Sequence, residues 1–348
     1  MSTFHKLTIR EIIKETADAV SIIFTIPEQL KTEFSFVAGQ YVNIKSTING
    51  EEIRRAYSIC SSPKSGRLKI TVKAVENGTF STHATSQLKA GDVLEVAIPE
   101  GKFILNTEAN KNYIGFAAGS GITPIMSMIK EVLENNNNAT FTLIYGNKTI
   151  ADTIFKAELD SLQHQFSDRF NLHYVYSRAH VEGARHGRID DSIANYFVKN
   201  VHKEISFKSA FLCGPEEMIH AVSDALKGCG FNEGTILFEL FTASTEEENT
   251  DQIQEGTSEI TILLDDEETT FTMAQTDNIL AASLRNDLDA PYSCQGGICS
   301  SCLGKVTVGK AVMTKNSILT DAEVNDGYIL TCQAHPTTTK ISIDFDDV

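Results

Sequence analysis

The most informative segment of this 348-residue chain lies in its C-terminal part and reads Cys294-Gln-Gly-Gly-Ile-Cys299-Ser-Ser-Cys302. A fourth cysteine, Cys332, follows it, and the complete spacing is C-x4-C-x2-C-x29-C. Thiolates are metal ligands, and four of them at this spacing bind a [2Fe–2S] cluster, three from one tight loop and one from a distant strand. The sequence therefore predicts an iron–sulfur domain with these four cysteines as ligands.

Small residues surround the four cysteines. Gly296 and Gly297 allow positive φ values, so the loop N–H groups can turn toward the cluster sulfides. A zinc site is the alternative, but zinc sites normally pair C-x2-C with a second close pair, and here Cys332 stands alone. Disulfides conflict with a reducing cytoplasm. An iron–sulfur cluster is the prediction that fits best.

The composition limits the number of domains and the class of protein. A chain of 348 residues with 41% hydrophobic residues exceeds a single core and predicts two or three domains. No apolar run reaches the roughly 20 residues that span a bilayer, and the polar N-terminus carries no signal peptide, so we expect a cytoplasmic protein without a membrane partner. The net charge of −16 argues against a nucleic-acid partner.

The negative charge is concentrated toward the C-terminus. Residues 1–241 carry a net charge of −2, residues 242–258 carry −5, and residues 259–348 carry −9. An acidic domain would steer toward a basic protein partner, although the same charge could serve solubility alone. Both interpretations stay open.

Hydrophobic periodicity divides the chain into four segments. Short alternating runs in residues 1–107 predict an antiparallel β-barrel. Strands that alternate with helices in residues 108–241 predict an α/β domain with a parallel sheet. Residues 242–258 have the composition of an extended acidic linker, and residues 259–348 contain two strands, a helix, the cysteine loop and further strands.

Residues 259–348 resemble a plant-type ferredoxin along their whole length, and residues 1–241 resemble the ferredoxin–NADP reductase family. The resemblance implies a flavin-binding barrel, an NAD(P)-binding domain and an α+β ferredoxin-like β-grasp domain. The order of the domains is similar to that of the reductase components of phenylacetyl-CoA epoxidases and ketosteroid hydroxylases. It implies FAD, a [2Fe–2S] cluster and NADPH or NADH as the electron donor.

Arg55-Ala-Tyr57-Ser58 matches the R-x-Y-S motif of the reductase family. The Arg55 fork suits a flavin pyrophosphate, Tyr57 can lie against the isoalloxazine ring, and Ser58 can donate to its edge. Further flavin-binding residues are predicted around a short helix, whose N-terminus can hold phosphate: Lys73, Val75, Gly78 and Ser81. Relatives place an aromatic residue or a Glu near the flavin, and Phe241 is the prediction here, with Glu239 as the alternative.

A glycine-rich turn and a Cys-Gly-Pro turn carry the predicted nicotinamide site. Gly119-Ser-Gly121-Ile-Thr123-Pro124 follows a strand and opens a helix, so a pyrophosphate can approach its backbone. Cys213-Gly214-Pro215 stands at the end of another strand, and the family resemblance implies that Cys213, with Thr123 and Phe241, lies where hydride is transferred. Ser177 and Arg178, assisted by Arg188, resemble a clasp for the 2′-phosphate and favour NADPH over NADH. Cys60 and Cys229 are interpreted as structural.

These parts together predict an NAD(P)H-dependent oxidoreductase. A nicotinamide gives electrons in pairs and a [2Fe–2S] cluster carries one at a time, so a flavin between them is required. The family resemblance implies that the acceptor is an oxygenase component, a multi-subunit di-iron phenylacetyl-CoA epoxidase of aromatic degradation. The alternatives are another oxygenase, such as a ketosteroid or ring hydroxylase, and a cluster-based redox sensor without turnover.

Overall fold

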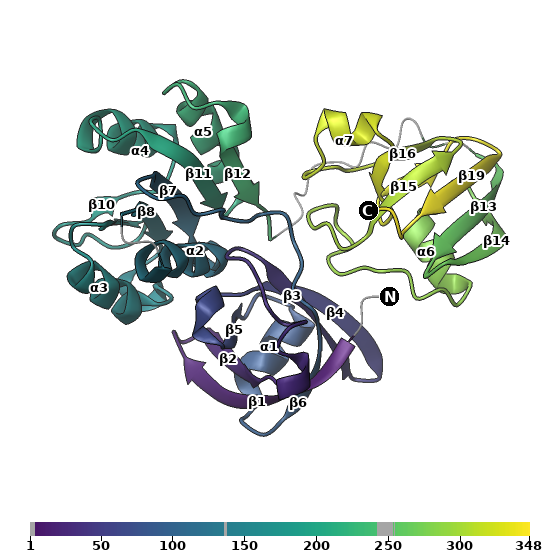
Figure 1. Cartoon of the computed structure of the whole chain (residues 1–348), viewed down its shortest axis with the longest axis horizontal. Coiled ribbons are helices and arrows are strands. Elements are labelled where there is room, and N and C mark those ends of the chain that lie inside the picture. Colours follow the sequence, from purple (N-terminus) through teal and green to yellow (C-terminus); the bar gives the residue numbers. More distant parts are fainter. Residues whose placement is uncertain (1–3, 136–137, 242–252, 254) are drawn as a thin grey trace. The chain divides into compact units, whose positions relative to one another are not determined.

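A computed structural model describes residues 4–135, 138–241, 253 and 255–348 (Figure 1). Two compact units divide the chain after Phe241, and each is described by itself. The predicted acidic linker, residues 242–258, falls largely outside the described residues. Among the helices that are described, none is long and apolar enough to cross a bilayer.

The first half of the 4–241 unit is a curled antiparallel sheet in the strand order β4-β3-β6-β1-β2-β5. Its interior holds the buried residues Leu7, Ile22, Val42 and Ile70. Over residues 6–10 buried and exposed side chains alternate, because successive strand residues point to opposite faces. The elements are β1 Phe4–Lys14, β2 Ala19–Thr25, β3 Tyr41–Ile48, β4 Glu51–Ser58, β5 Leu68–Lys73, α1 Thr79–Ser86 and β6 Val93–Ala97.

The second half is a sheet with all strands parallel, in the order β10-β9-β8-β7-β11-β12. Helices cover both of its faces (Figure 1). The chain starts the sheet at β7 and adds strands first on one side and then on the other, so the strand order reverses between β7 and β11. The elements are β7 Asn112–Ala118, α2 Ile122–Asn135, β8 Thr140–Asn147, α3 Lys156–Gln165, β9 Phe170–Tyr176, β10 Arg185–His186, α4 Asp191–Tyr196, β11 Phe207–Cys213, α5 Glu216–Lys227 and β12 Ile236–Glu239.

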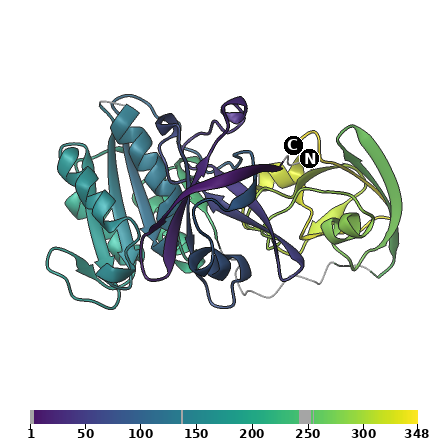
Figure 2. The ribbon, with the colours of Figure 1, turned by 90° about the horizontal axis from the view of Figure 1, so that it is seen from below.

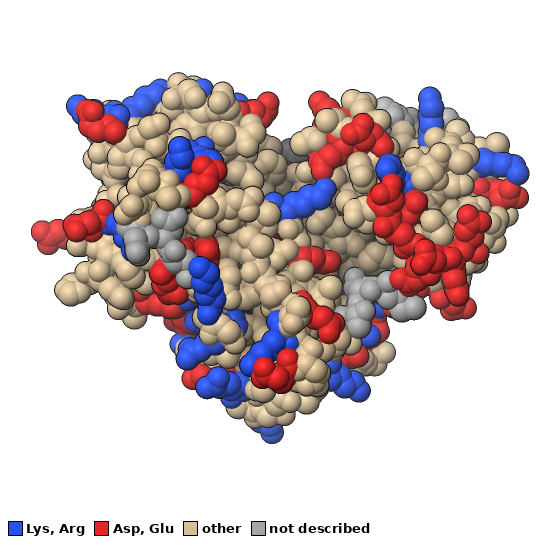
Figure 3. All heavy atoms as spheres, in the orientation of Figure 1, with Lys and Arg blue, Asp and Glu red and all other residues tan. Residues whose placement is uncertain are grey.

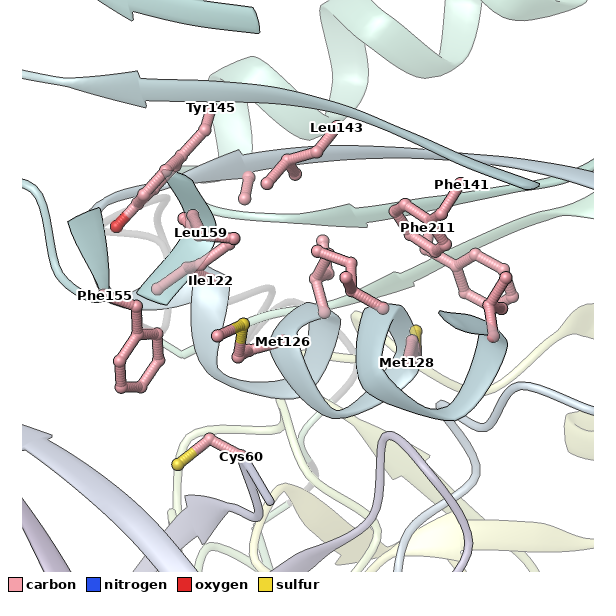
Figure 4. Close-up of a cluster of buried hydrophobic side chains, with 14 of the residues drawn as sticks. Cys60, Ile122, Met126, Met128, Phe141, Leu143, Tyr145, Phe155, Leu159 and Phe211 are labelled. Atoms are coloured by element: carbon pink, nitrogen blue, oxygen red, sulfur yellow. The ribbon is translucent and has the colours of Figure 1, made fainter. Parts of the chain in front are cut away.

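Helix α2 joins the two halves of this unit. Ile122 and Met126 on α2 pack with Leu143 and Tyr145 of the parallel sheet, and Cys60 of the antiparallel sheet belongs to the same core (Figure 4). The side chains of α2 that face these neighbours are completely buried. The two sheets are therefore parts of one packed body.

The 255–348 unit is a five-stranded mixed sheet in the order β14-β13-β19-β15-β17, with a separate two-stranded ladder β16-β18. Figure 2 shows the long β13–β14 hairpin at the edge of this unit. The elements are β13 Thr257–Leu264, β14 Glu267–Ala274, α6 Ile279–Arg285, β15 Leu303–Val308, β16 Ala311–Met313, α7 Asp321–Asn325, β17 Tyr328–Leu330, β18 Ala334–Pro336 and β19 Lys340–Asp344.

Some elements differ from the sequence expectation. Strand β13 begins at Thr257, two residues before residue 259, because Thr257 still pairs with Ala274 across the hairpin. The helix expected over residues 216–230 ends at Lys227, where Phe231 donates its N–H back to the carbonyl of Leu226.

Candidate functional site

Two backbone turns meet where the order of the parallel strands reverses. The Gly119–Gly121 turn follows β7, and the Cys213-Gly214-Pro215 turn follows β11, the neighbouring strand. A Cβ on Gly121 would stand 2.0 Å from the Cys213 carbonyl oxygen, so only glycine allows this approach. In open α/β sheets the crevice at such a reversal is where dinucleotides bind.

The residues around these turns are held firmly. Tyr145 on β8 donates its hydroxyl to the Gly119 carbonyl at 2.9 Å, a contact that the sequence did not suggest. Thr123 is buried and donates its hydroxyl to the Ser120 carbonyl at 3.0 Å. Pro124 lies in the first turn of α2, where a missing N–H costs the helix no hydrogen bond. The structure thus brings Gly119, Gly121, Thr123 and Cys213 together.

A hydrogen bond links the antiparallel sheet to the parallel sheet at the same edge. Ser58, the last residue of β4, donates its hydroxyl to Oε2 of Glu239 at 3.0 Å. Glu239 ends β12 and pairs in register with Cys213 at the end of β11. The R-x-Y-S motif and the Cys-Gly-Pro turn therefore lie on either side of one carboxyl group.

Burial dominates the electrostatics of this group. Glu239 is half-buried, and burial raises the pKa of its carboxyl to about 8, an effect that the Ser58 hydrogen bond opposes only in part. Burial also raises the pKa of the Cys213 thiol well above its usual value, and the nearby Glu239 adds to the effect. At neutral pH both groups hold their protons.

The predicted flavin-binding residues of the antiparallel sheet differ in their exposure and in their side-chain partners. Tyr57 packs on Phe80 of α1 with ring centroids 5.5 Å apart. The Arg55 guanidinium is exposed and donates to the Arg54 carbonyl at 2.7 Å. Lys73 points to Asp18, with 3.6 Å between Nζ and Oδ2, so its ammonium already has a carboxylate partner in the barrel.

The turn before α1 has the shape of an anion site. Gly78 caps the helix without a side-chain acceptor, and a Cβ there would meet Ser81 Oγ at 2.3 Å. Ser81 accepts a hydrogen bond from the Val75 N–H at 3.3 Å and so shapes the turn, while the Val75 side chain is exposed. A first turn without a side-chain cap, close to the exposed Arg55 strand, fits the phosphates of FAD.

The predicted 2′-phosphate clasp lies two strands away from the glycine turn. Ser177 and Arg178 follow β9, and their N–H groups donate to the carbonyls of Asn147 and Lys148, both at 2.9 Å. These bonds fix the backbone while the Arg178 side chain stays exposed. Arg188 is also exposed. Adjacent strands lie about 4.8 Å apart, so this clasp stands about 10 Å from the β7 turn, in the direction in which a dinucleotide would extend.

The four predicted cluster ligands lie in the 255–348 unit. Cys294 and Cys299 have their sulfur atoms 3.1 Å apart, and the Gly296 N–H points to Cys294 Sγ at 3.3 Å. Cys302 and Cys332 are buried partners of one another. Within each pair the thiol–thiol contact lowers the pKa of one member, Cys294 to about 6, and raises that of the other.

The loop backbone differs in one detail from the expectation. Gly297 has a φ of +72°, but the second residue with positive φ is Gln295 (+51°) and not Gly296. The Gln295 conformation is supported by its carbonyl, which accepts a hydrogen bond from the Gln333 amide at 3.1 Å. The sequence suggested both glycines because it did not show this side-chain support.

The surroundings fit an iron–sulfur cluster. The Ser293 hydroxyl is buried, adjoins Cys294 and has no hydrogen-bond partner among the described residues, as expected of a donor reserved for a cluster sulfur. Cys294, Cys299, Cys302 and Cys332 are the residues that would hold the two irons.

Glu239 is the residue of the candidate site that the sequence analysis gave only as an alternative. Phe241 was predicted instead, and its side chain is 40% exposed, whereas Glu239 makes the bond to Ser58. The only signal in the sequence was the acidic residue in Glu239-Leu-Phe241 at the end of a parallel strand. A role for Phe241 stays a prediction.

Three domain families match the chain in order. The oxidoreductase FAD-binding domain matches residues 6–105, the oxidoreductase NAD-binding domain matches residues 116–224, and the 2Fe-2S iron–sulfur cluster binding domain matches residues 262–337. The predicted combination of FAD, NAD(P)H and a [2Fe–2S] cluster is confirmed.

Relatives extend the match over the whole chain. The chain is 36% identical to a component of the 1,2-phenylacetyl-CoA epoxidase of Escherichia coli, over 99% of both chains. It is 30% identical to the ferredoxin reductase component of the 3-ketosteroid-9-alpha-monooxygenase of Rhodococcus rhodochrous, over 97% of this chain and 96% of the other. Among solved structures, phthalate dioxygenase reductase shares the fold, with a TM-score of 0.61, 24% identity and 98% coverage of each chain. The chain belongs to the family of NAD(P)H-dependent oxidoreductases that combine FAD-binding, NAD-binding and [2Fe–2S] domains as reductase components of oxygenases.

Proposed function

We propose that this chain transfers electrons from NADPH through FAD and its [2Fe–2S] cluster to a phenylacetyl-CoA epoxidase. The observation that carries the proposal is the 36% identity to a component of such an epoxidase over 99% of both chains, together with the three matching domains. The acceptor would be a multi-subunit di-iron oxygenase in aromatic degradation. Reductase components of other oxygenases share less identity.

The proposal assigns each segment a task. Residues 1–107 bind FAD, residues 108–241 bind NADPH, residues 242–258 link these to the cluster, and residues 259–348 carry it. Arg55 and the Gly78–Ser81 turn hold the flavin phosphates, with Tyr57 beside the ring. Ser177 and Arg178 hold the 2′-phosphate, which is why NADPH is preferred to NADH.

The residues of the chain supply position and a proton, while bound FAD would supply the conversion of an electron pair into single electrons. Gly121 and Gly214 have no side chains, so their backbones can lie in contact and leave room for the nicotinamide beside Cys213. Glu239 keeps its proton at neutral pH, since burial raises its pKa to about 8. Ser58 Oγ lies 3.0 Å from Oε2 of Glu239, so Ser58 would accept the Glu239 proton as it donates its own hydroxyl proton toward the edge of bound FAD.

An acidic rim on the 255–348 unit supports delivery to a basic partner. Asp346 accepts hydrogen bonds from the N–H groups of Asp265 and Asp266, both at 2.9 Å, which gathers carboxylates at one end of the sheet. Strand β15 begins at this same end, directly after Cys302, because its Lys305 pairs with Asp344 of β19. Figure 3 shows Asp and Glu side chains gathered on this unit.

A reconstitution experiment tests the proposal. The purified chain is mixed with the oxygenase subunits of a phenylacetyl-CoA epoxidase, and NADPH oxidation that depends on phenylacetyl-CoA is measured together with the epoxide. We expect coupled turnover there and little with a 3-ketosteroid-9-alpha-monooxygenase oxygenase. Coupling to the steroid oxygenase alone would assign a different acceptor, and failure to reduce cytochrome c with NADPH would contradict electron transfer itself.

A further inference from the structure

A polar contact zone lies between α2 and the segment that follows Ser58. Ser127 of α2 donates its hydroxyl to the Ser61 carbonyl at 2.7 Å, and both residues are buried. One turn later, the Lys130 ammonium donates to the Cys60 carbonyl at 3.1 Å. Two successive backbone carbonyls of the segment that follows Ser58 are thus bound by one face of one helix.

The Lys130 ammonium also belongs to a compensated network of charges. Its Nζ lies 2.7 Å from Glu158 of α3, and Glu158 lies 3.7 Å from Lys69 of β5. Lys69 in turn pairs with Glu15 at 3.2 Å. The network holds two lysines and two glutamates, so its formal charges cancel. Burial opposes ionisation of Glu158, but Lys130 and then Lys69 outweigh it and hold the pKa of that carboxyl below its usual value.

The contact zone connects the two halves of the candidate site. Residues 59–61 continue directly from Ser58, which bonds to Glu239. Helix α2 continues directly from the Gly119–Gly121 turn, whose backbone lies against Cys213. Any shift of α2 along the antiparallel sheet would change the separation between Ser58 and Gly121.

Apolar packing is the less directional of the contacts that α2 makes. Met126 and Met128 lie in this core together with Ile122 (Figure 4), and methionine side chains adapt to small displacements at little cost. Hydrogen bonds to carbonyl oxygens are directional and lose strength steeply when their geometry changes. The directional contacts here are those of Ser127 and Lys130.

We propose that Lys130 is a positioning residue for hydride transfer, which holds the nicotinamide turn at a fixed distance from the flavin strand through the Cys60 carbonyl and Glu158. The inference rests on the proposed function. Hydride transfer requires reacting atoms within about 3.5 Å, and a displacement of about 1 Å can slow a reaction 100-fold. Lys130 is not among the predicted cofactor-binding residues and acts through the elements that carry them.

The test compares Lys130→Met with Lys156→Met in the full-length protein. Methionine keeps the apolar stem of the side chain and removes the ammonium. Lys156 is the control, because its ammonium is also partly buried and paired, with Asp160 of α3 and over the Tyr174 ring of the parallel sheet, but makes no bond to residues 59–61. We expect the rate of flavin reduction at saturating NADPH to fall about tenfold in Lys130→Met, with an increased deuterium isotope effect and an NADPH dissociation constant within about twofold of the original. Lys156→Met should leave all three unchanged.

Hydrogen exchange gives a second readout that does not depend on turnover. Amides of residues 59–62 should exchange faster in Lys130→Met, and amides of β12 should not. If the variant is too unstable to purify, Ser127→Ala removes the neighbouring bond with little change in volume, and we expect about a threefold slower flavin reduction. A lower melting temperature with unchanged flavin reduction and isotope effect would overturn the proposal and leave Lys130 a purely stabilising residue. Absence of flavin reduction in the unaltered protein would instead refute the proposed function.

Discussion

The carboxyl of the half-buried Glu239 should make the stability of the 4–241 unit depend on pH. In the unfolded chain a glutamate loses its proton near pH 4.5, whereas in the folded protein Glu239 keeps its proton until about pH 8. Between these values the unfolded state is favoured by about 1.4 kcal/mol for each pH unit. The stability that the neutral Glu239 carboxyl contributes is fully present below the pKa of the unfolded chain. It is lost as the pH rises from there through the pKa of the folded protein.

Glu239→Gln isolates this contribution. Glutamine is neutral at every pH and can still accept the hydrogen bond from Ser58. The free energy of unfolding of Glu239→Gln, minus that of the original protein, should therefore increase by about 3–4 kcal/mol between about pH 5 and pH 8. Urea unfolding followed by far-ultraviolet circular dichroism at several pH values measures this difference.

Glu233→Gln is the matched control. Glu233 lies a few residues before β12 but is exposed and pairs with Lys227 at 2.7 Å, and its pKa is lowered by that pair. Its unfolding free energy should follow that of the original protein across the same pH range. If the Glu239→Gln and original curves also ran parallel, the carboxyl would be ionised in the folded protein and could not store a proton.

Three further outcomes are expected. Cys302→Ala should abolish reduction of cytochrome c by NADPH and leave reduction of ferricyanide largely intact, because ferricyanide can take electrons from the flavin; equal loss of both in a steady-state assay would contradict this order of carriers. Arg178→Leu should lower kcat/KM for NADPH about 10- to 100-fold and leave kcat/KM for NADH within about twofold, since only NADPH carries the 2′-phosphate. An equal loss for both donors would show that Arg178 does not bind the 2′-phosphate. Delivery of electrons to the oxygenase should slow as salt rises, because charges are screened beyond about 8–10 Å at physiological ionic strength, and stopped-flow rates independent of salt would leave the acidic rim a role in solubility only.

The sequence was most informative where ligands share one loop. Cys294, Cys299 and Cys302 lie within nine residues, so their spacing alone predicted the cluster. Gly121 was predicted from its place between a strand and a helix, because a glycine-rich turn by itself is weaker evidence than the cysteine spacing. In both cases the chemistry depends on local backbone geometry.

The sequence was least informative where a site joins distant elements. Ser58 and Glu239 are 181 residues apart in the sequence. They meet only because the last residues of β4 and β12 lie together in the folded 4–241 unit. Lys73, predicted to bind the flavin, also has a partner that its position in the sequence did not indicate, since its Nζ lies 3.6 Å from Oδ2 of Asp18, and its role at the flavin stays a prediction. Side-chain partners of this kind are set by tertiary packing, which no spacing rule records.

The distance between Arg178 and the glycine turn also bears on how such reductases can diversify. Arg178 follows β9, and two strand spacings separate it from the β7 turn, where Gly121 and Cys213 touch through their backbones. If Arg178 binds the 2′-phosphate as proposed, substitutions in the loop after β9 would change which donor is preferred without moving any atom beside Cys213. A lineage, or a protein engineer, can therefore exchange one nicotinamide donor for the other while the hydride-transfer geometry is inherited unchanged.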